Sequence, residues 1–329
     1  MKHNNRQGRE RGLKAVAIGT IVPIALIAAF LIFGMPLITS SVFGYNQTVS
    51  SQTILNVTNS RPTVTEVYVF DNETTDNIID LVGGSQKIVY CNATVNDYNG
   101  ASDINNATAA LYHSSSSYPA SDSNSDHYTN GSCGSCIGID TDNATCSCRF
   151  NIWYYAVNNT WTCNITVYDF GGESKSTILH NHGTGTGIVN SLISIEIPPV
   201  IDFGNLTVGS LSDEVTHNVT NYGNVPVNIT VRAYGGDNES AYSTMAMICR
   251  RGQIALTWEK YTGHAGSDYT TMTSVTDINT QIQNFVVGKR TDPNSLGNST
   301  NSTYWRLQVP GSVAGMCNGT VIFTGLASH

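Results

Sequence analysis

The feature that most constrains the fold of this chain is one long apolar stretch near the N-terminus. Residues 15–38 form a run of 24 residues without a charged side chain, long enough to cross about 30 Å of hydrocarbon as a helix. Five basic residues precede the run, and no Lys or Arg follows it before Arg61; the five are Lys2, Arg6, Arg9, Arg11 and Lys14. Because basic flanks stay on the cytoplasmic side, we expect residues 1–14 inside the cell and everything after Thr39 outside it.

The apolar stretch has three possible fates. It is an uncleaved anchor, or it is a signal peptide cut near the small residue Gly44. A third alternative comes from Arg11-Gly12-Leu13, which directly precedes the stretch and resembles the class III signal of archaeal pilins and archaellins. That resemblance implies a cut after Gly12 and a helix that becomes the core of a filament.

Composition limits what the rest of the chain can be. Only 12% of residues are charged, the formal net charge is -8, and 40% of residues are hydrophobic. An acidic chain with few lysines lacks the electrostatic footprint of a nucleic-acid binder, and its apolar content is too high for full disorder. We therefore expect a folded protein without a nucleic-acid partner.

Acceptor motifs for N-linked glycans are unusually frequent. The chain has 33 Asn and 69 Ser plus Thr, for which chance predicts about 7 Asn-x-Ser/Thr motifs. It contains sixteen, all beyond the apolar stretch, and this excess indicates a glycoprotein. The acceptors are Asn46, Asn56, Asn72, Asn92, Asn106, Asn130, Asn143, Asn158, Asn164, Asn205, Asn218, Asn228, Asn238, Asn298, Asn301 and Asn318.

Several acceptors lie in segments that alternate between apolar and polar residues. Residues 91–97 (CNATVND) and 163–169 (CNITVYD) share one pattern, and residues 317–323 (CNGTVIF) repeat its start. With a period of two, the Cys, Ala or Ile, and Val side chains face a core while Asn and Thr face solvent. The pattern predicts half-buried strands with glycan acceptors on their wet face.

The eight cysteines are expected to form disulfides. They are even in number and all follow the apolar stretch, on the oxidising side of a membrane; they are Cys91, Cys133, Cys136, Cys146, Cys148, Cys163, Cys249 and Cys317. The matching strands of Cys91 and Cys163 favour a bond between two sheets, and the two C-terminal cysteines are expected to pair. The pairing of the other four stays open, and a zinc site formed by their thiolates is the alternative.

The fold class expected from these patterns is all-β, with two immunoglobulin-like β-sandwich domains behind one N-terminal transmembrane or signal helix. The predicted parts are a cytoplasmic basic segment over 1–14, the helix over 15–38, a polar stalk or extended strand over 39–61, a Cys-rich β-sandwich over 62–182, a flexible Gly/Thr linker over 183–190 and a second β-sandwich over 191–329. Strands are expected at 63–70, 86–97, 107–113, 149–155, 160–169, 192–197, 214–221, 226–234, 253–260, 280–287, 304–309 and 317–324. Residues 113–148 are expected to be mostly loop.

Two segments of the C-terminal part carry a family resemblance. Residues 201–210 (IDFGNLTVGS) and 221–231 (NYGNVPVNITV) resemble a pattern of immunoglobulin-like domains in archaeal cell-surface glycoproteins. They are also similar to a strand pair of TasA/camelysin-type fibre subunits. The resemblance spans about residues 63–329 and implies a glycosylated β-sandwich protein outside the cell.

Motifs for chemistry are missing or weak in this sequence. No HExxH, GxSxG or Walker A motif occurs. Asp122-x-Asn124-x-Asp126 has the rhythm of a calcium loop but lacks its Gly and its final acid. Asp97, Asn99 and Asp103 are interpreted as turn formers. We therefore expect no catalytic residue, no cofactor and no bound metal.

The function expected from the sequence is a non-enzymatic, N-glycosylated structural or adhesion protein of the cell surface. Its partners would be the membrane, through the N-terminal helix, N-linked glycans, and copies of itself or other surface proteins. A filament subunit is the alternative, with a core formed by the helix or with residues 49–57 donated to a neighbour's open sheet edge. A second alternative is an extracellular metal-binding module.

Overall fold

The structure, a computed structural model, describes residues 49–171 and 180–328. The predicted basic segment and the apolar stretch over residues 15–38 lie outside these residues, as does the acceptor Asn46. In the described ranges, no helix is both long enough and apolar enough to span a membrane. Residues 49–62 belong to no strand or helix.

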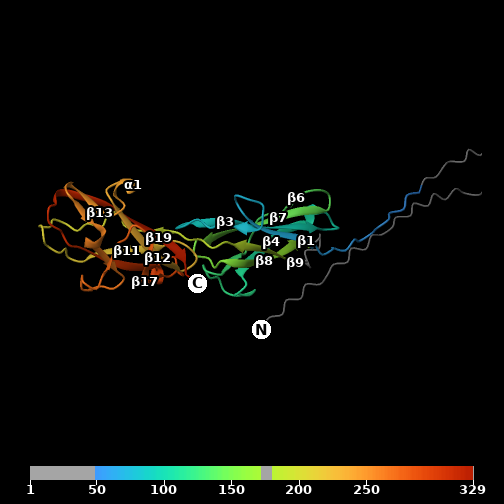
Figure 1. The fold of residues 1–329 in the computed structure, drawn as a ribbon. Helices are drawn as coiled ribbons and strands as arrows, with labels where there is room; N and C mark the ends of the chain where they lie inside the picture. Colours follow the sequence, from blue (N-terminus) through green and yellow to red (C-terminus); the bar gives the residue numbers. More distant parts are fainter. Residues whose placement is uncertain (1–48, 172–179, 329) are drawn as a thin grey trace, which may run out of the picture. The chain divides into compact units, whose positions relative to one another are not determined.

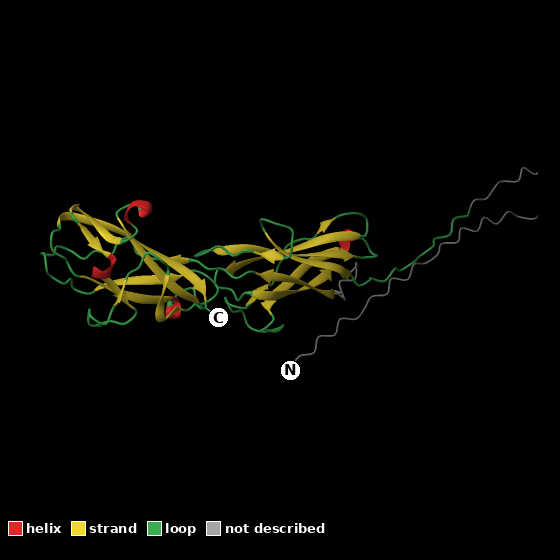
Figure 2. Cartoon of the chain, in the orientation of Figure 1, coloured by secondary structure: helices red, strands yellow, loops and turns green. Residues whose placement is uncertain are grey.

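The described chain is all-β, as the alternating patterns predict (Figures 1 and 2). Residues 56–329 fall into one compact unit, in which the strands gather into four sheets. The helical segments are short: α1 (Glu239–Tyr242) and the 3-10 turns η1 (Ala101–Asp103), η2 (Leu256–Trp258) and η3 (Gly297–Ser299).

The first sheet pair is formed by strands β1 to β9. One sheet has the order β1 (Thr63–Asp71), β3 (Gln86–Asn96), β7 (Asn143–Trp153) and β6 (Ile137–Gly138). The other has the order β2 (Ile78–Ile79), β9 (His180–Val189), β8 (Asn159–Asp169), β4 (Ile104–His113) and β5 (His127–Asn130). Both sheets contribute to a single buried core, which includes Val89, Ile165 and Trp161.

The second sheet pair is formed by strands β10 to β19. One sheet has the order β10 (Ile195–Glu196), β11 (Val215–Asn221), β18 (Thr300–Leu307), β15 (Glu259–Thr262) and β16 (Thr273–Ser274). The other has the order β14 (Gln253–Ala255), β13 (Met245–Arg251), β19 (Ala314–Ala327), β12 (Val227–Gly235) and β17 (Thr280–Val287). Val231, Phe285 and Trp305 are in the core that these two sheets enclose.

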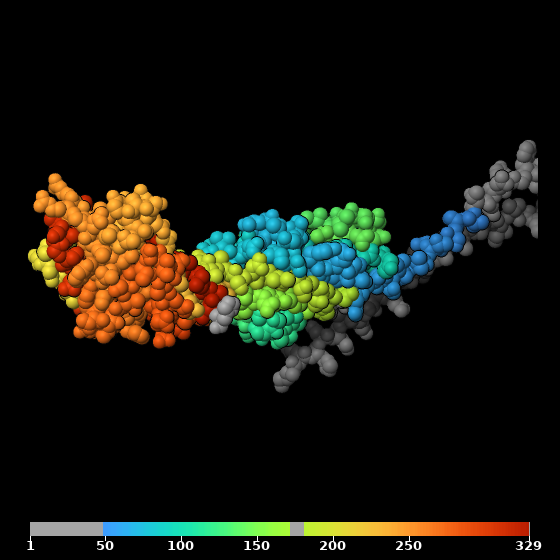
Figure 3. All heavy atoms as spheres, in the orientation of Figure 1, coloured from blue at the N-terminus to red at the C-terminus, as the bar shows by residue number. Residues whose placement is uncertain are grey.

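The flexible linker predicted over residues 183–190 is wrong, because residues 183–189 belong to strand β9. This strand pairs with β8 along its length. Its glycines alternate with Thr, and a Cβ added to Gly187 would lie 2.8 Å from Val69 Cγ1 of β1. The Gly-Thr repeat therefore follows the two-residue period of a strand. The glycines face inward and let the facing sheet approach closely, while the threonines face outward and stay exposed. Figure 3 shows this yellow-green part of the chain on the surface of the first sheet pair.

Two other strand predictions differ from the structure. Residues 113–148 contain β5, β6 and the start of β7, instead of being mostly loop. The single strand predicted over 253–260 is divided by η2, and its halves β14 and β15 belong to different sheets. Strand β13 is missing from the prediction, because MAMICRR alternates only weakly between apolar and polar residues.

Candidate functional site

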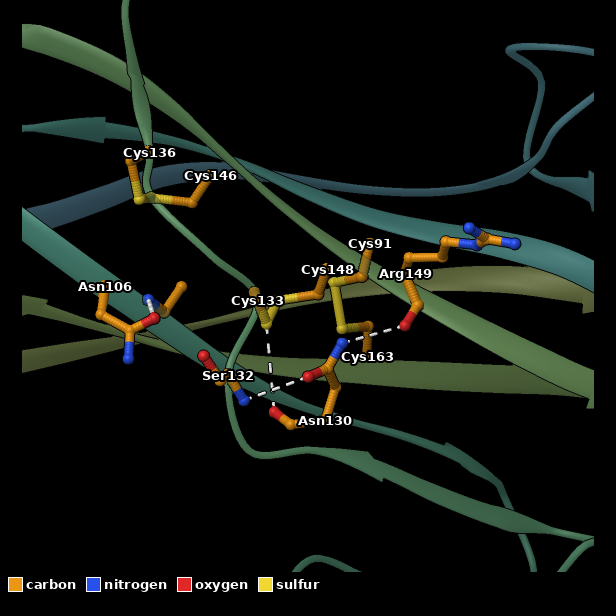
Figure 4. Close-up of a disulfide and its surroundings, with 11 residues drawn as sticks. Cys91, Asn106, Asn130, Ser132, Cys133, Cys136, Cys146, Cys148, Arg149 and Cys163 are labelled. Carbon is orange, nitrogen blue, oxygen red and sulfur yellow. Dashed lines mark hydrogen bonds between the residues drawn. A yellow bond between two sulfur atoms is a disulfide. The ribbon is translucent and has the colours of Figure 1, made fainter.

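One disulfide crosses the first sheet pair at its centre. Cys91 lies on β3 and Cys163 on β8, in facing sheets, and the two are bonded to each other (Figure 4). Both side chains are fully buried. Strand β3 alternates as predicted, because Ala93 and Val95 are buried while Asn92 and Thr94 stay partly exposed. The alternation fails at Thr166 of β8, which is buried and hydrogen-bonded through its hydroxyl to His182, and residues 317–323 of β19 do not alternate.

The Cys-rich loop is closed by two further disulfides, whose pairing the sequence left open. Cys133 is bonded to Cys148, and Cys136 to Cys146. The backbone N–H of Cys133 also donates to the carbonyl of Ala107 on β4, at 2.9 Å. The loop thus carries the chain from the sheet that contains β4 to the sheet that contains β7, and both disulfides hold this crossing in place (Figure 4).

The fourth disulfide, Cys249–Cys317, joins neighbouring strands of one sheet. All eight cysteines are thereby oxidised and no cysteine is free. A sulfur in a disulfide is no thiolate, so the zinc alternative for the Cys-rich loop has no support. Four disulfides indicate that the folded part of this protein resides in an oxidising, extracellular environment.

The glycan acceptors lie away from both cores. None of the fifteen acceptor asparagines in the described ranges is buried. The exposed ones are Asn56, Asn72, Asn205, Asn218, Asn238, Asn298 and Asn318, and the half-buried ones are Asn92, Asn106, Asn130, Asn143, Asn158, Asn164, Asn228 and Asn301.

In four of the half-buried acceptors, the amide nitrogen to which a glycan would be attached already donates a hydrogen bond. Asn130 Nδ2 donates to the carbonyl of Arg149 at 3.0 Å (Figure 4). The same atom of Asn143, Asn158 and Asn301 donates to Asp140, to the Ser191 hydroxyl and to the Val286 carbonyl. Folding therefore separates the four acceptors with a hydrogen-bonded amide nitrogen from the seven exposed ones.

The weak calcium motif at Asp122 forms a local turn. Asp122 Oδ1 lies 3.4 Å from His127 Nδ1, and Asp122 Oδ2 accepts a hydrogen bond from the Thr129 hydroxyl at 3.0 Å. Its carboxylate is thus directed at β5. Asp97 does form the predicted turn, since its Oδ1 accepts from the backbone N–H of Asn99 at 2.8 Å.

The fold brings two further residues to this turn, Asp169 and Asn59, which the sequence pattern did not single out. Asn59 Nδ2 donates to Asp169 Oδ2 at 2.8 Å. A signal for Asp169 exists in the sequence, because Asp97 and Asp169 each follow a cysteine of the same disulfide by six residues. Asn59 has no such signal, because it precedes the first strand.

Comparisons with known proteins give little further information. No protein-family model matches the chain, and no curated protein matches it. A solved structure of a chaperone–tip adhesin complex of CFA/I fimbriae biogenesis is similar at a TM-score of 0.30 and 9% identity, over 83% of this chain and 90% of that chain. A hypothetical protein from Parabacteroides merdae is similar at a TM-score of 0.23 and 17% identity, over 54% of this chain and 45% of that chain. TM-scores this low do not establish a shared fold.

Proposed function

We propose that this chain is a non-enzymatic, N-glycosylated structural or adhesion protein, displayed on the cell surface by its apolar segment 15–38. The observation that carries the proposal is that the fold buries cysteines but no glycan acceptor among the described residues. Five of the eight cysteines are buried, whereas none of the described acceptor asparagines is. The surface would carry small polar side chains and glycans, and disulfides cross-link the structure beneath it. This combination suits a protein that stays intact outside the cell.

We also propose that each sheet pair is an immunoglobulin-like β-sandwich, as the resemblance to archaeal cell-surface glycoproteins implies. The disulfide between facing sheets and the buried Trp161 support this assignment for the first pair. The activity of such a protein would be contact, either with copies of itself or with other surface proteins. We assign a catalytic role to no residue.

Glycopeptide mass spectrometry of protein from its native membrane tests this function. We expect glycans on the exposed acceptors, including Asn205 and Asn218, and lower occupancy at Asn130 and Asn158, whose amides are hydrogen-bonded. Asn218→Gln should remove the mass of one glycan. Asn279→Gln, at an exposed Asn outside any acceptor motif, should leave the mass of the glycans unchanged. Unmodified asparagines at every exposed acceptor would contradict the proposal.

A filament subunit is the second candidate function, and the segment before β1 favours it. Val49, Ile54, Leu55 and Val57 are between 71% and 94% exposed, in a stretch that joins no sheet. Exposed apolar residues in an extended segment fit a strand that is donated to the sheet edge of another copy. The mass of the mature N-terminus separates the alternatives: Met1 indicates an anchor, Leu13 a pilin-like helix, and a start near Tyr45 a secreted or strand-donating form.

A further inference from the structure

Three carboxylates meet at one end of the first sheet pair, although they are far apart in the sequence. Asp97 directly follows β3, Asp103 ends η1, and Asp169 is the last residue of β8. One carboxylate oxygen from each lies within 4.8 Å of the others. The shared disulfide explains the meeting of Asp97 and Asp169, because both follow its cysteines by six residues on strands of facing sheets.

Three buried oxygen atoms at this cluster accept no hydrogen bond from the described residues. Asp97 is 0% exposed; its Oδ1 accepts from the Asn99 N–H, but its Oδ2 has no hydrogen-bond partner. Asp103 Oδ2 and Asn59 Oδ1 are also shut off from solvent without a partner. A buried acceptor without a donor is destabilising, so three of them in one place indicate that the site accommodates a group able to satisfy oxygen.

Negative charge accumulates at this cluster. No basic side chain of the described residues forms an ion pair with Asp97 or Asp103. Ionised carboxylates whose oxygens lie within 4.8 Å of one another repel, and Asp97 is fully buried, where water screens that repulsion least. A cation bound between the carboxylates would relieve this repulsion.

We propose that Asp97, Asp103 and Asp169, together with the Asn59 side chain, form a binding site for one calcium ion. All candidate ligands are oxygens, which suits a hard cation and not zinc. Oxygens bound to one Ca²⁺ at about 2.4 Å lie no more than about 4.8 Å apart, and the three carboxylate oxygens meet this limit. Magnesium demands a near-ideal octahedron, keeps several waters and is usually bound through one or two carboxylates, whereas calcium accepts a larger and less regular set of protein oxygens.

A calcium ion at this place would fasten the segment that leads into the fold. Asn59 precedes β1, whereas the three acids belong to the ends of β3 and β8 and to η1. Ser60 N–H also donates to Asn99 Oδ1 in the same turn. The ion would therefore bind the leading segment to two loops of the sheet pair. Extracellular calcium, at about millimolar concentration, matches the affinity of about 10⁻⁴–10⁻³ M that is common in extracellular modules.

Calorimetric titration and thermal unfolding of the full chain in detergent test this site, with CaCl₂ and MgCl₂ as the probes. We expect one equivalent of Ca²⁺ to bind and the midpoint of thermal unfolding to rise with Ca²⁺. Asp103→Asn should abolish both effects. In EDTA the same variant should unfold at a temperature equal to or above that of the wild type, because the substitution removes repulsion between carboxylates. A purely structural aspartate would give the opposite result in EDTA.

Asp213→Asn is the matched control, because Asp213 is an exposed acid outside the cluster. It should keep the calcium response in full. The proposal is overturned if the wild type shows no calcium response up to about 10 mM, roughly tenfold above the weakest affinities of extracellular sites. It is also overturned if Asp103→Asn binds calcium as the wild type does, or if magnesium alone gives the response.

Discussion

Cys91 and Cys148 lie directly opposite each other on the paired strands β3 and β7, but each is bonded to a different partner. Cys91 is linked to Cys163 in the facing sheet, and Cys148 to Cys133 in the loop. Neighbouring residues of β3 and β7 thus anchor two disulfides. One links β3 to the facing sheet, and the other links β7 to the Cys-rich loop. The Cys91–Cys163 disulfide also aligns β3 and β8 so that Asp97 lies near Asp169.

Removal of the central disulfide should cost more stability than removal of a loop disulfide. Cys91–Cys163 has a sequence separation of 72 and Cys136–Cys146 one of 10. The chain-entropy estimate is about 4 kcal/mol for the former and about 3 kcal/mol for the latter. Removing the buried Cys91 and Cys163 sulfurs also leaves a cavity. Denaturant unfolding of the two double Cys→Ala variants measures the difference, and equal losses would contradict the central role of Cys91–Cys163.

Gly185→Ala should destabilise the first sheet pair by about 1–3 kcal/mol. A Cβ at this position of β9 would collide with the backbone carbonyl of Val67 on β1, and backbone yields less easily than a side chain. Gly311→Ala is the control, because no atom lies within 4 Å of the Cβ that it adds. The free energy of unfolding from denaturant titration should fall only for Gly185→Ala. A flexible linker would tolerate both changes.

Lys87→Met should cost about 3–5 kcal/mol, because it leaves a buried carboxylate without its cation. Lys87 Nζ lies 3.2 Å from Asp71 Oδ2, and the two side chains are 3% and 2% exposed. Burial opposes ionisation of Asp71, but the N–H groups of nearby residues, Glu73 first, and the Lys87 ammonium hold its pKa below the ordinary value. The more exposed pair Arg232–Glu239 is the control, and Arg232→Met should cost less than about 1 kcal/mol.

Glu259 should make the second sheet pair less stable as pH rises. Burial raises the pKa of this 2%-exposed side chain from 4.5 to about 8. Below its unfolded pKa the carboxyl is neutral in both states. As pH rises toward 8, the unfolded state ionises first, and stability falls at up to about 1.4 kcal/mol per pH unit.

Glu259→Gln isolates this effect from that of the other titrating groups. Burial lowers the pKa of His217, which destabilises the protein at acid pH in wild type and variant alike. Thermal unfolding from about pH 5 to about pH 9 should therefore show the variant gaining stability relative to the wild type as pH rises. A constant difference across this range would show that Glu259 ionises as freely in the folded state as in the unfolded chain.

The sequence alone was sufficient to predict that the described chain is all-β. The alternation in residues 91–97 reports burial directly, because a strand has a period of two. The same reasoning failed at residues 183–189, where glycine was interpreted as flexible. Glycine there is the inward-facing residue of a strand, and only the closeness of β1 explains why a side chain is missing.

The sequence by itself thus determined an all-β chain with Cys91 and Cys163 in a core and no acceptor asparagine buried among the described residues, because local periodicity encodes which face of a strand is buried. Only the tertiary structure decided how the four loop cysteines pair and that Asn59 joins three distant aspartates. Such pairings depend on the order of strands in the sheets and on which sheets face each other. Sequence separation carries no information about either, because a β-sheet joins segments across the whole chain.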